Sequence, residues 1–356
     1  MKKTLISLLL CTSALASSND VGRIIEGNQI IMNDFSYVSS LSLHKKVQIA
    51  VIGDYVHPEE FQSITPNYAE IEGNGVDDDG NGYIDDYYGY DAHFRNGSLE
   101  TPVLTGHENG IVSIMDAIIS NYDLMNNISI IPISIYSVDG RFDEMRFKKM
   151  ADSIDFAVTR GVDIISISQG ISKYNKYSFL FIDNDYEKSM NYIKQAIKRA
   201  KDKGVLIVGS VSNDNSRDHV DEPSIPGNLE NVTSVANVDF DGVIQSGYGR
   251  NVDIAYFGTD IFVWAGRCED YVRRSRGSCN DLLSNSGFEL VKGSSLSTPI
   301  VAVALAVVKA TGAEVKFDDK FNKRISTSCS KKITSRKNVN SKCIFSPAEF
   351  TKAYVK

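Results

Sequence analysis

The chain has 356 residues, of which 42% are hydrophobic and 10% aromatic, so it is long enough to bury a substantial core. Its formal net charge is -7 and no basic stripe runs along it, which argues against nucleic acid as a partner. It contains no repeat, low-complexity tract or evident linker, so one large domain is the simplest organisation.

The N-terminus has the layout of a secretory signal peptide. Two lysines precede an apolar run at residues 5–10, and small residues then lead up to Ala16. We predict cleavage after Ala16, a short segment at 17–44 and one domain over 45–356. The apolar run is too short to span a bilayer. The sequence thus predicts a secreted or periplasmic monomer without stable membrane insertion.

Four cysteines remain after this cleavage, and an even number in an exported chain indicates disulfides. They are Cys268, Cys279, Cys329 and Cys343. Three pairings are possible, and proximity in the sequence favours 268 with 279 and 329 with 343. Their spacing does not resemble that of a zinc site.

Apolar strands and amphipathic helices alternate along the chain. Strands are predicted at 47–53, 127–138, 162–168, 205–211 and 232–239. Helices are predicted at 109–120, 147–161, 184–204 and from 294 onward. Pro132 would interrupt the hydrogen bonding of its strand if that strand were central. Strands that are apolar on both faces indicate an α/β fold with a mostly parallel sheet covered on both sides.

Four hydroxyl residues open the last of these helices, just before Pro299. They are Ser294, Ser295, Ser297 and Thr298. A helix N-terminus needs one such side chain as a cap, so the surplus suggests that one serine is a nucleophile.

Polar residues also mark the ends of other elements, where the sites of parallel sheets lie. Asp54 follows the first strand, His107 precedes a helix, and Asn213 follows a later strand. A serine such as Ser295 needs a base to remove its proton and an acid to orient that base. An amide can donate a hydrogen bond to a developing oxyanion.

In these segments the chain resembles the subtilisin-like serine proteases, the subtilases. "GSSLSTP" is similar to their serine motif Gly-Thr-Ser-Met-Ala-x-Pro, "GHENGIVSI" to their histidine motif His-Gly-Thr-x-Val-Ala, and "SVSNDN" to the segment of their oxyanion asparagine. The resemblance covers about residues 45 to 310 in the family's order. It implies a three-layer subtilisin-like sandwich, with Ser295 as nucleophile, His107 as base and Asn213 as oxyanion donor.

The resemblance also covers "DIISISQG" and "VDIAYFGTDI". It implies that Ser168, Gly170 and Ser210 line the groove that binds a protein or peptide substrate.

The chain departs from the family at the acid. Subtilases have aspartate directly after Val-Ile, whereas here Gly53 stands in that place and Asp54 follows. A shift of one residue turns a side chain to the other face of a strand. We therefore predict a bulge at Gly53 that turns Asp54 toward His107; otherwise Asp54 caps a loop. The Gly-Thr after the histidine is also missing.

A dense acidic segment, "GNGVDDDGNGYIDDYYGYD", suggests a calcium site. Asp77, Asp79 and Asn81 alternate before a glycine, and Asp85 stands at the ninth position, as in the first part of an EF-hand loop. The twelfth position is Tyr88, so the segment is not an EF-hand. Its negative charge favours a bound cation, and the alternative is a hydrated turn.

These features predict an exported serine endopeptidase. A first alternative is a weak or inactive subtilisin-fold protein that binds peptides or proteins, since the acid is displaced and Gly-Thr is lost. A second is an unrelated esterase, but such an enzyme should show Gly-x-Ser-x-Gly around its serine, and Ser295 has no such motif.

Overall fold

The computed structural model of the chain describes residues 27–97, 99, 106–135, 146–172, 186–214, 224–266, 287–334, 337 and 339–355. The predicted signal peptide, Asn184, Cys268 and Cys279 lie outside these residues.

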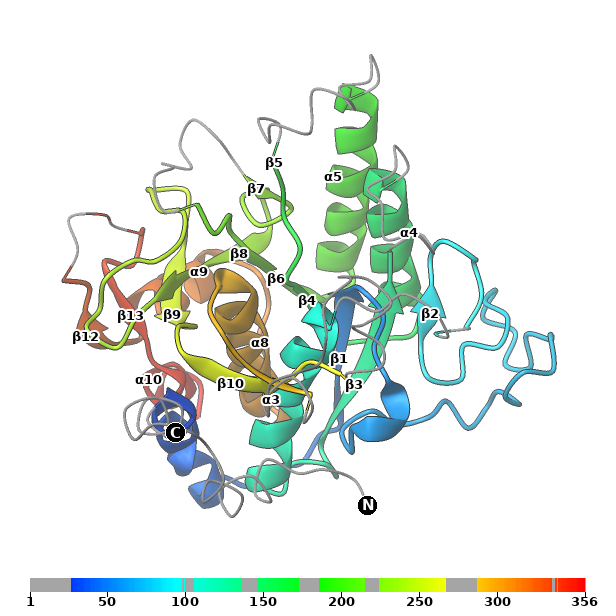
Figure 1. Ribbon diagram of the computed structural model, residues 1–356, viewed down its shortest axis with the longest axis horizontal. Helices are drawn as coiled ribbons and strands as arrows, with labels where there is room; N and C mark the ends of the chain where they lie inside the picture. Colours follow the sequence, from blue (N-terminus) through cyan, green and yellow to red (C-terminus); the bar gives the residue numbers. More distant parts are fainter. Residues whose placement is uncertain are drawn as a thin grey trace.

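Short helices and strands alternate along the chain (Figure 1). The strands are β1 (Val47–Gly53), β2 (Tyr90–Asp91), β3 (Ile128–Ser134), β4 (Ile164–Ile167), β5 (Ile171–Ser172), β6 (Leu206–Ser210), β7 (Ser224–Ile225), β8 (Val232–Val238), β9 (Ile254–Phe257), β10 (Ile261–Trp264), β11 (Phe288–Val291), β12 (Cys329–Lys332) and β13 (Cys343–Phe345). The helices are α3 (His107–Asn121), α4 (Arg146–Thr159), α5 (Tyr186–Asp202), α8 (Ser294–Ala310), α9 (Asp319–Thr327) and α10 (Pro347–Lys352), with 3₁₀ turns η2 (Ser36–Ser40) and η3 (Pro58–Glu60). Residues 27–34 are also helical.

A nine-stranded sheet forms the centre of the described part, in the order β12-β13-β9-β8-β6-β4-β1-β3-β2. All neighbouring strands in it are parallel except β12 and β13, which are antiparallel. Two further pairs, β10 with β11 and β5 with β7, form small antiparallel sheets. The predicted α/β fold with a mostly parallel sheet is confirmed.

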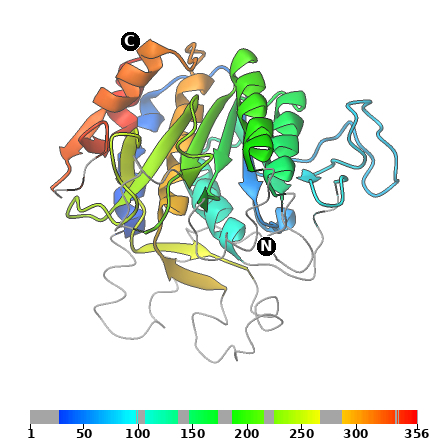
Figure 2. The ribbon, with the colours of Figure 1, turned by 90° about the horizontal axis from the view of Figure 1, so that it is seen from above.

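The sheet is covered on both faces, as its apolar strands require. Side chains of β1 alternate between the two faces. Ile49 and Val51 pack in one core with α3 and α8, whereas Ala50 and Ile52 pack in a second core with α4 and α5. Figure 2 shows the green helices α4 and α5 on the opposite side of the sheet from the orange helix α8. Burying an isoleucine or valine side chain stabilises the fold by about 1.5–3 kcal/mol.

Pro132 lies within β3, opposite Val51 of β1. On its other side β3 pairs with the two-residue strand β2, and this pairing begins only at Ile133, opposite Tyr90. The proline thus precedes the pairing with β2, and this explains how it fits within the sheet.

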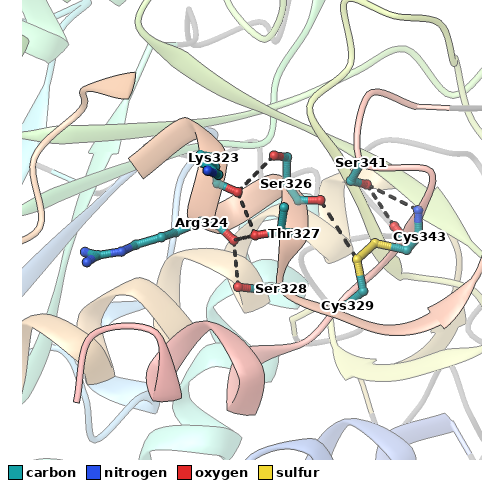
Figure 3. Close-up of a disulfide and its surroundings, with 8 residues drawn as sticks. All are labelled: Lys323, Arg324, Ser326, Thr327, Ser328, Cys329, Ser341 and Cys343. Atoms are coloured by element: carbon teal, nitrogen blue, oxygen red, sulfur yellow. Dashed lines mark hydrogen bonds between the residues drawn. A yellow bond between two sulfur atoms is a disulfide. The ribbon is translucent and has the colours of Figure 1, made fainter. Parts of the chain in front are cut away.

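Segments at both ends of the chain pack onto this domain. Ile31 and Phe35 are fully buried in the core, and the Tyr256 hydroxyl donates a hydrogen bond to Asp34 at 2.9 Å. At the other end a disulfide joins Cys329 at the start of β12 to Cys343 at the start of β13 (Figure 3). This is one of the two pairs that sequence proximity favoured.

Among the described helices, none combines the length and the apolar character that crossing a bilayer requires.

Candidate active site

Ser295 lies in the first turn of α8 and differs from the hydroxyl residues around it. Ser294, Ser297 and Thr298 are fully buried, whereas Ser295 is partly exposed. The three buried hydroxyls donate to backbone oxygens: Ser294 to Val211, Ser297 to Tyr256, and Thr298 to Ser294. The surplus of hydroxyls is therefore structural in three cases, and Ser295 is the one left facing solvent.

The hydroxyl of Ser295 makes no hydrogen bond to the described residues, His107 included. In substrate-free sites the bond between nucleophile and base is often long and tightens when substrate binds.

Asn213 is held beside the start of α8 by its own side chain. Its Oδ1 accepts from the backbone N–H of Ser294 at 2.9 Å and lies 3.0 Å from the Ser294 hydroxyl oxygen, whose proton is donated to the Val211 carbonyl. With the oxygen engaged in this way, the amide nitrogen is left as a donor. The residue is exposed, so this donor can reach a ligand at the surface beside Ser295.

His107 is the first residue of α3, and its ring is 37% exposed. Gly106 caps this helix with φ of 76°, a left-handed conformation that glycine adopts easily. Its α-carbon also packs so closely against the Ala265 carbonyl that a side chain would collide with it. These constraints fix the point at which α3 begins and hence the position of the imidazole.

A carboxylate binds the Nδ1 side of this imidazole, and it belongs to Glu108. Glu108 Oε2 lies 2.9 Å from His107 Nδ1, and the Glu108 side chain is fully buried. The amide of Gln169 donates to Glu108 Oε1 at 3.0 Å. Burial acts to raise the pKa of Glu108, but the charge and hydrogen bond of His107, the Gln169 amide and the Asp54 backbone N–H together hold it below its usual value.

Asp54, which the sequence assigned to this role, makes a different contact. Its Oδ1 accepts from the backbone N–H of Tyr55 at 2.9 Å, as a loop-capping carboxylate does. The predicted bulge at Gly53 is wrong, because β1 pairs with β3 in unbroken register up to Gly53 opposite Ser134. A regular strand does not re-aim the residue that follows it, and the acid on Nδ1 comes from the helix instead.

Two consecutive residues after β4 connect the serine and the histidine. The Ser168 hydroxyl donates to the carbonyl oxygen of Ser295 at 2.8 Å, and the next residue, Gln169, contacts the pair formed by His107 and Glu108. Consecutive α-carbons are about 3.8 Å apart. The starts of α3 and α8 therefore meet at this end of the sheet.

The predicted substrate-binding residues lie at the same end but differ in exposure. Ser168 and Ser210 are 4% and 2% exposed, so their side chains face the protein, whereas Gly170 is exposed. A β-carbon on Gly170 would approach the Ser224 hydroxyl. Among the three, Gly170 is the residue open to solvent.

Glu108 and Gln169 were both missed in the sequence. Glu108 follows the histidine where the family has glycine, and Gly53 stands where the family has aspartate. Each departure taken alone suggested a damaged site. Their complementarity was the signal that could have identified Glu108.

The geometry agrees with a comparison of sequences. A sequence model of the subtilase family matches residues 44–318. The chain belongs to the subtilase family. A comparison with curated proteins finds no significant match.

Solved structures of proteases share the fold of this subtilase. A lanthipeptide protease is 17% identical, with a TM-score of 0.62 and 96% of each chain covered. The epidermin leader peptide processing protease EpiP from Staphylococcus aureus is 16% identical, with a TM-score of 0.61 over 96% of this chain and 83% of that chain. The nisin leader peptidase NisP from Lactococcus lactis is 16% identical, with a TM-score of 0.58 over 92% and 93%.

The acidic segment of this subtilase extends away from the sheet between η3 and β2, at the right of Figure 1. Carboxylate oxygens of Glu70, Asp77 and Asp79 lie within 4.8 Å of one another. Glu70 is 4% exposed, and its Oε2 has no hydrogen-bond partner in the described part of the chain. Burial, together with the charges of Asp86 and Asp79, raises the pKa of Glu70.

Two of the predicted metal ligands have other contacts in this segment. Asp85 accepts from the Gly75 backbone N–H at 2.9 Å and lies outside the group of three carboxylates. The Asn81 side chain accepts from the Tyr83 backbone N–H and donates to Asp79. The convergent oxygens are thus those of Asp77, Asp79 and Glu70, and Glu70 was not predicted. An oxygen-only set with one unpartnered buried carboxylate oxygen fits the preference of Ca²⁺.

Proposed function

We propose that this subtilase is an exported serine endopeptidase that hydrolyses peptide bonds in protein or peptide substrates. The observation that carries the proposal is the isolation of one hydroxyl: Ser295 is partly exposed at the start of α8, and its hydroxyl neighbours are bonded internally. A base, His107, begins the adjacent helix with its Nδ1 bound to a carboxylate.

The reaction follows from these positions. Nε2 of His107 removes the proton from Ser295 Oγ as that oxygen bonds to the scissile carbonyl carbon. The carbonyl oxygen becomes an oxyanion, which accepts hydrogen bonds from the Asn213 amide and the Ser295 backbone N–H. The imidazolium then gives its proton to the leaving amine as the C–N bond breaks. Water hydrolyses the acyl-enzyme by the same proton transfers.

Export and substrate class have separate support. The disulfide between Cys329 and Cys343 is typical of an oxidising compartment, and residues 1–16 have the pattern of a signal peptide. EpiP and NisP are described as proteases that process leader peptides. Their likeness to this chain is one of fold, so we propose only the class of protein or peptide substrates.

We also propose that calcium binds the acidic segment and stabilises the fold. Asp77 and Asp79, with Glu70, would hold the ion through carboxylate oxygens, and Asn81 orients Asp79. When bound, the ion would offset the repulsion among these carboxylates.

A catalytically weak binding protein is the second candidate, because Gly53 replaces the aspartate of the family pattern. Labelling with a fluorophosphonate probe distinguishes the two. We expect purified wild-type protein to be labelled at Ser295 and Ser295→Ala to remain unlabelled. Absence of labelling in folded wild-type protein would favour the binding protein.

A further inference from the structure

We propose that Glu108 serves as the acid of the triad, holding His107 from helix α3, and that position 53 is glycine because this carboxylate fills its side-chain space. The inference rests on the proposed peptidase function and names a positioning residue for it. Glu108 acts through the imidazole and touches no substrate.

The first observation is the environment of the Glu108 carboxylate. Its side chain is fully buried, and its basic partner among the described residues is the imidazole of His107; no described lysine or arginine side chain pairs with it. A buried carboxylate is tolerated only when it is paired and hydrogen-bonded. Here the donors are the imidazole, the Gln169 amide and the Asp54 backbone N–H.

The second observation is the position of Glu108 in the first turn of α3. Unpaired backbone N–H groups give a helix N-terminus a partial positive charge, which favours an anion. The carboxylate is thereby kept ionised beside a histidine that must gain and lose a proton. A structural glutamate could be satisfied by a permanent cation, whereas this one is paired with a titrating group.

The third observation is the space at Gly53. A β-carbon built on Gly53 would collide with the Glu108 carboxyl group, including its Oε1 and Cδ atoms. The φ angle of Gly53 lies outside the left-handed region, and β1 continues through it in register. Backbone conformation therefore does not require glycine here, but the Glu108 side chain does.

Together, these observations indicate that the two departures from the family sequence, at Gly53 and Glu108, are one change: the acid has moved from the strand to the helix. The family pattern has an acid at the end of the strand and glycine after the histidine, whereas this chain has Gly53 and Glu108. A single space beside Nδ1 is filled from the strand in the first arrangement and from the helix in the second. Either arrangement leaves room for one carboxylate.

The chemical consequence concerns the tautomer of the imidazole. Glu108 Oε2 accepts a hydrogen bond from the Nδ1–H group, which leaves the Nε2 lone pair free to take the proton of Ser295. When Nε2 is protonated, the carboxylate stabilises the imidazolium until the proton passes to the leaving amine. Glu108 itself keeps its negative charge throughout.

The decisive measurement compares Glu108→Gln with a matched control on the same helix. Asp116→Asn also removes a buried carboxylate of α3, and its acceptor for the Ser63 N–H is retained. We expect Glu108→Gln to lower kcat by about 10⁴ with little change in KM, the scale known for a triad aspartate changed to an amide. Asp116→Asn should keep kcat within about threefold of wild type. A change no larger than this is expected of a buried carboxylate outside the proposed triad.

The pH profile separates positioning from general structural support. Without its counter-charge the imidazolium loses its proton more easily. We therefore expect the acidic limb of the kcat/KM profile of Glu108→Gln to move to lower pH. A loss of kcat smaller than about tenfold in Glu108→Gln, or a loss of the expected size in Asp54→Asn instead, would overturn the proposal.

Exchanging the two residues tests the space argument. Gly53→Asp alone should collide with Glu108 and lose activity, and Glu108→Gly alone should lack an acid. The double variant restores the family arrangement, so we expect at least about tenfold more activity than in Glu108→Gly, a non-additive gain. A folded double variant no better than Glu108→Gly would count against a shared space.

A spectroscopic readout keeps this inference separate from the peptidase function. The Nδ1 proton resonance and titration of His107, assigned by its loss in His107→Ala, should change in Glu108→Gln and stay as in wild type in Asp116→Asn. If wild-type protein is inert toward fluorophosphonate yet shows this change, the peptidase function fails and the pairing stands. An unchanged histidine signal in Glu108→Gln would overturn the pairing whatever the activity.

Discussion

The carboxylate of Glu108 occupies the space into which a side chain at Gly53 would project. One residue of the strand and one residue of the helix thus compete for a single place beside Nδ1 of His107. Because the place is filled, an acid missing from the strand is weak evidence for an inactive relative. Other subtilase sequences with glycine at the end of this strand should be inspected for an acid directly after the histidine.

The pH dependence of stability should reflect Glu108. Its pKa in the folded chain lies below the usual 4.5, because the partners of the carboxylate outweigh the effect of burial. The unfolded chain therefore holds this proton more tightly, so the stabilisation is complete above the unfolded pKa and is lost as the pH falls through the folded pKa. Urea unfolding at a series of pH values measures it. The free energy of unfolding of wild type relative to Glu108→Gln should decline as the pH falls below the usual glutamate pKa of 4.5.

A difference between the two proteins that stays constant over this series of pH values would contradict the assigned direction of the pKa shift. Asp116→Asn provides the control, since it retains Glu108.

Ser295 and Ser297 should respond oppositely to replacement by alanine. Ser295→Ala should abolish hydrolysis and leave the unfolding free energy close to wild type, because its hydroxyl is partly exposed and has no described partner. Ser297→Ala leaves the buried Tyr256 carbonyl without its donor and should cost about 1–3 kcal/mol. Hydrolysis rates and urea unfolding check both variants. Normal turnover in Ser295→Ala would remove it from the mechanism.

Asn213 is bonded to the start of α8 and is our proposed oxyanion donor, and two substitutions can separate these roles. Asn213→Asp keeps an oxygen to accept from Ser294 but loses the amide donor, whereas Asn213→Ala loses both. We expect either variant to lower kcat by about 10²–10³ with little change in KM, the scale measured for an oxyanion-hole asparagine of a subtilisin. Only Asn213→Ala should also lower the melting temperature. A rise in KM alone would instead make Asn213 a substrate-binding residue.

Much of the fold followed from local patterns in the sequence. The predicted strand at 47–53 coincides with β1, and the helix predicted from Ser294 is α8, because continuous apolar runs leave few alternatives in a covered parallel sheet. The edge strand β12 and its neighbour β13 were not predicted. Each is short, and local periodicity reveals neither the disulfide that joins them nor the pairing of β13 with β9.

The candidate site likewise has a part that the sequence predicted and a part that it did not. Ser295, His107 and Asn213 stand at element ends that hydrophobic patterns locate, and the structure brings these ends together. The acid was missed because a comparison position by position looks for it after the strand. The paired departures at positions 53 and 108 were a signal in the sequence, and the packing of β1 against α3 shows that the side chain of Glu108 fills the space at Gly53.

The acidic segment allows a last test, in which Glu70 is the informative residue. The spacing of Asp77, Asp79, Asn81 and Asp85 suggested the ligands, but Glu70 comes from an earlier part of the loop and faces Asp77 and Asp79. If Ca²⁺ binds there, saturating it at about 100 times its Kd should stabilise the fold by about 2.7 kcal/mol. Chelation should then lower the melting temperature of wild type.

Glu70→Gln and Asp79→Asn should each remove most of this sensitivity to chelator, measured as the shift in melting temperature between excess calcium and excess chelator. Asp78→Asn is the matched control: it removes the same charge from the same loop, and its carboxylate is bonded instead to the Ile71 N–H and the Asn74 amide. If sensitivity to chelator survives in Glu70→Gln but disappears in Asp85→Asn, the calcium ligands are those predicted from the spacing of acidic residues in the sequence. Identical melting curves of wild type with calcium and with chelator would leave the segment an acidic turn whose carboxylates are held by backbone N–H groups and side-chain amides.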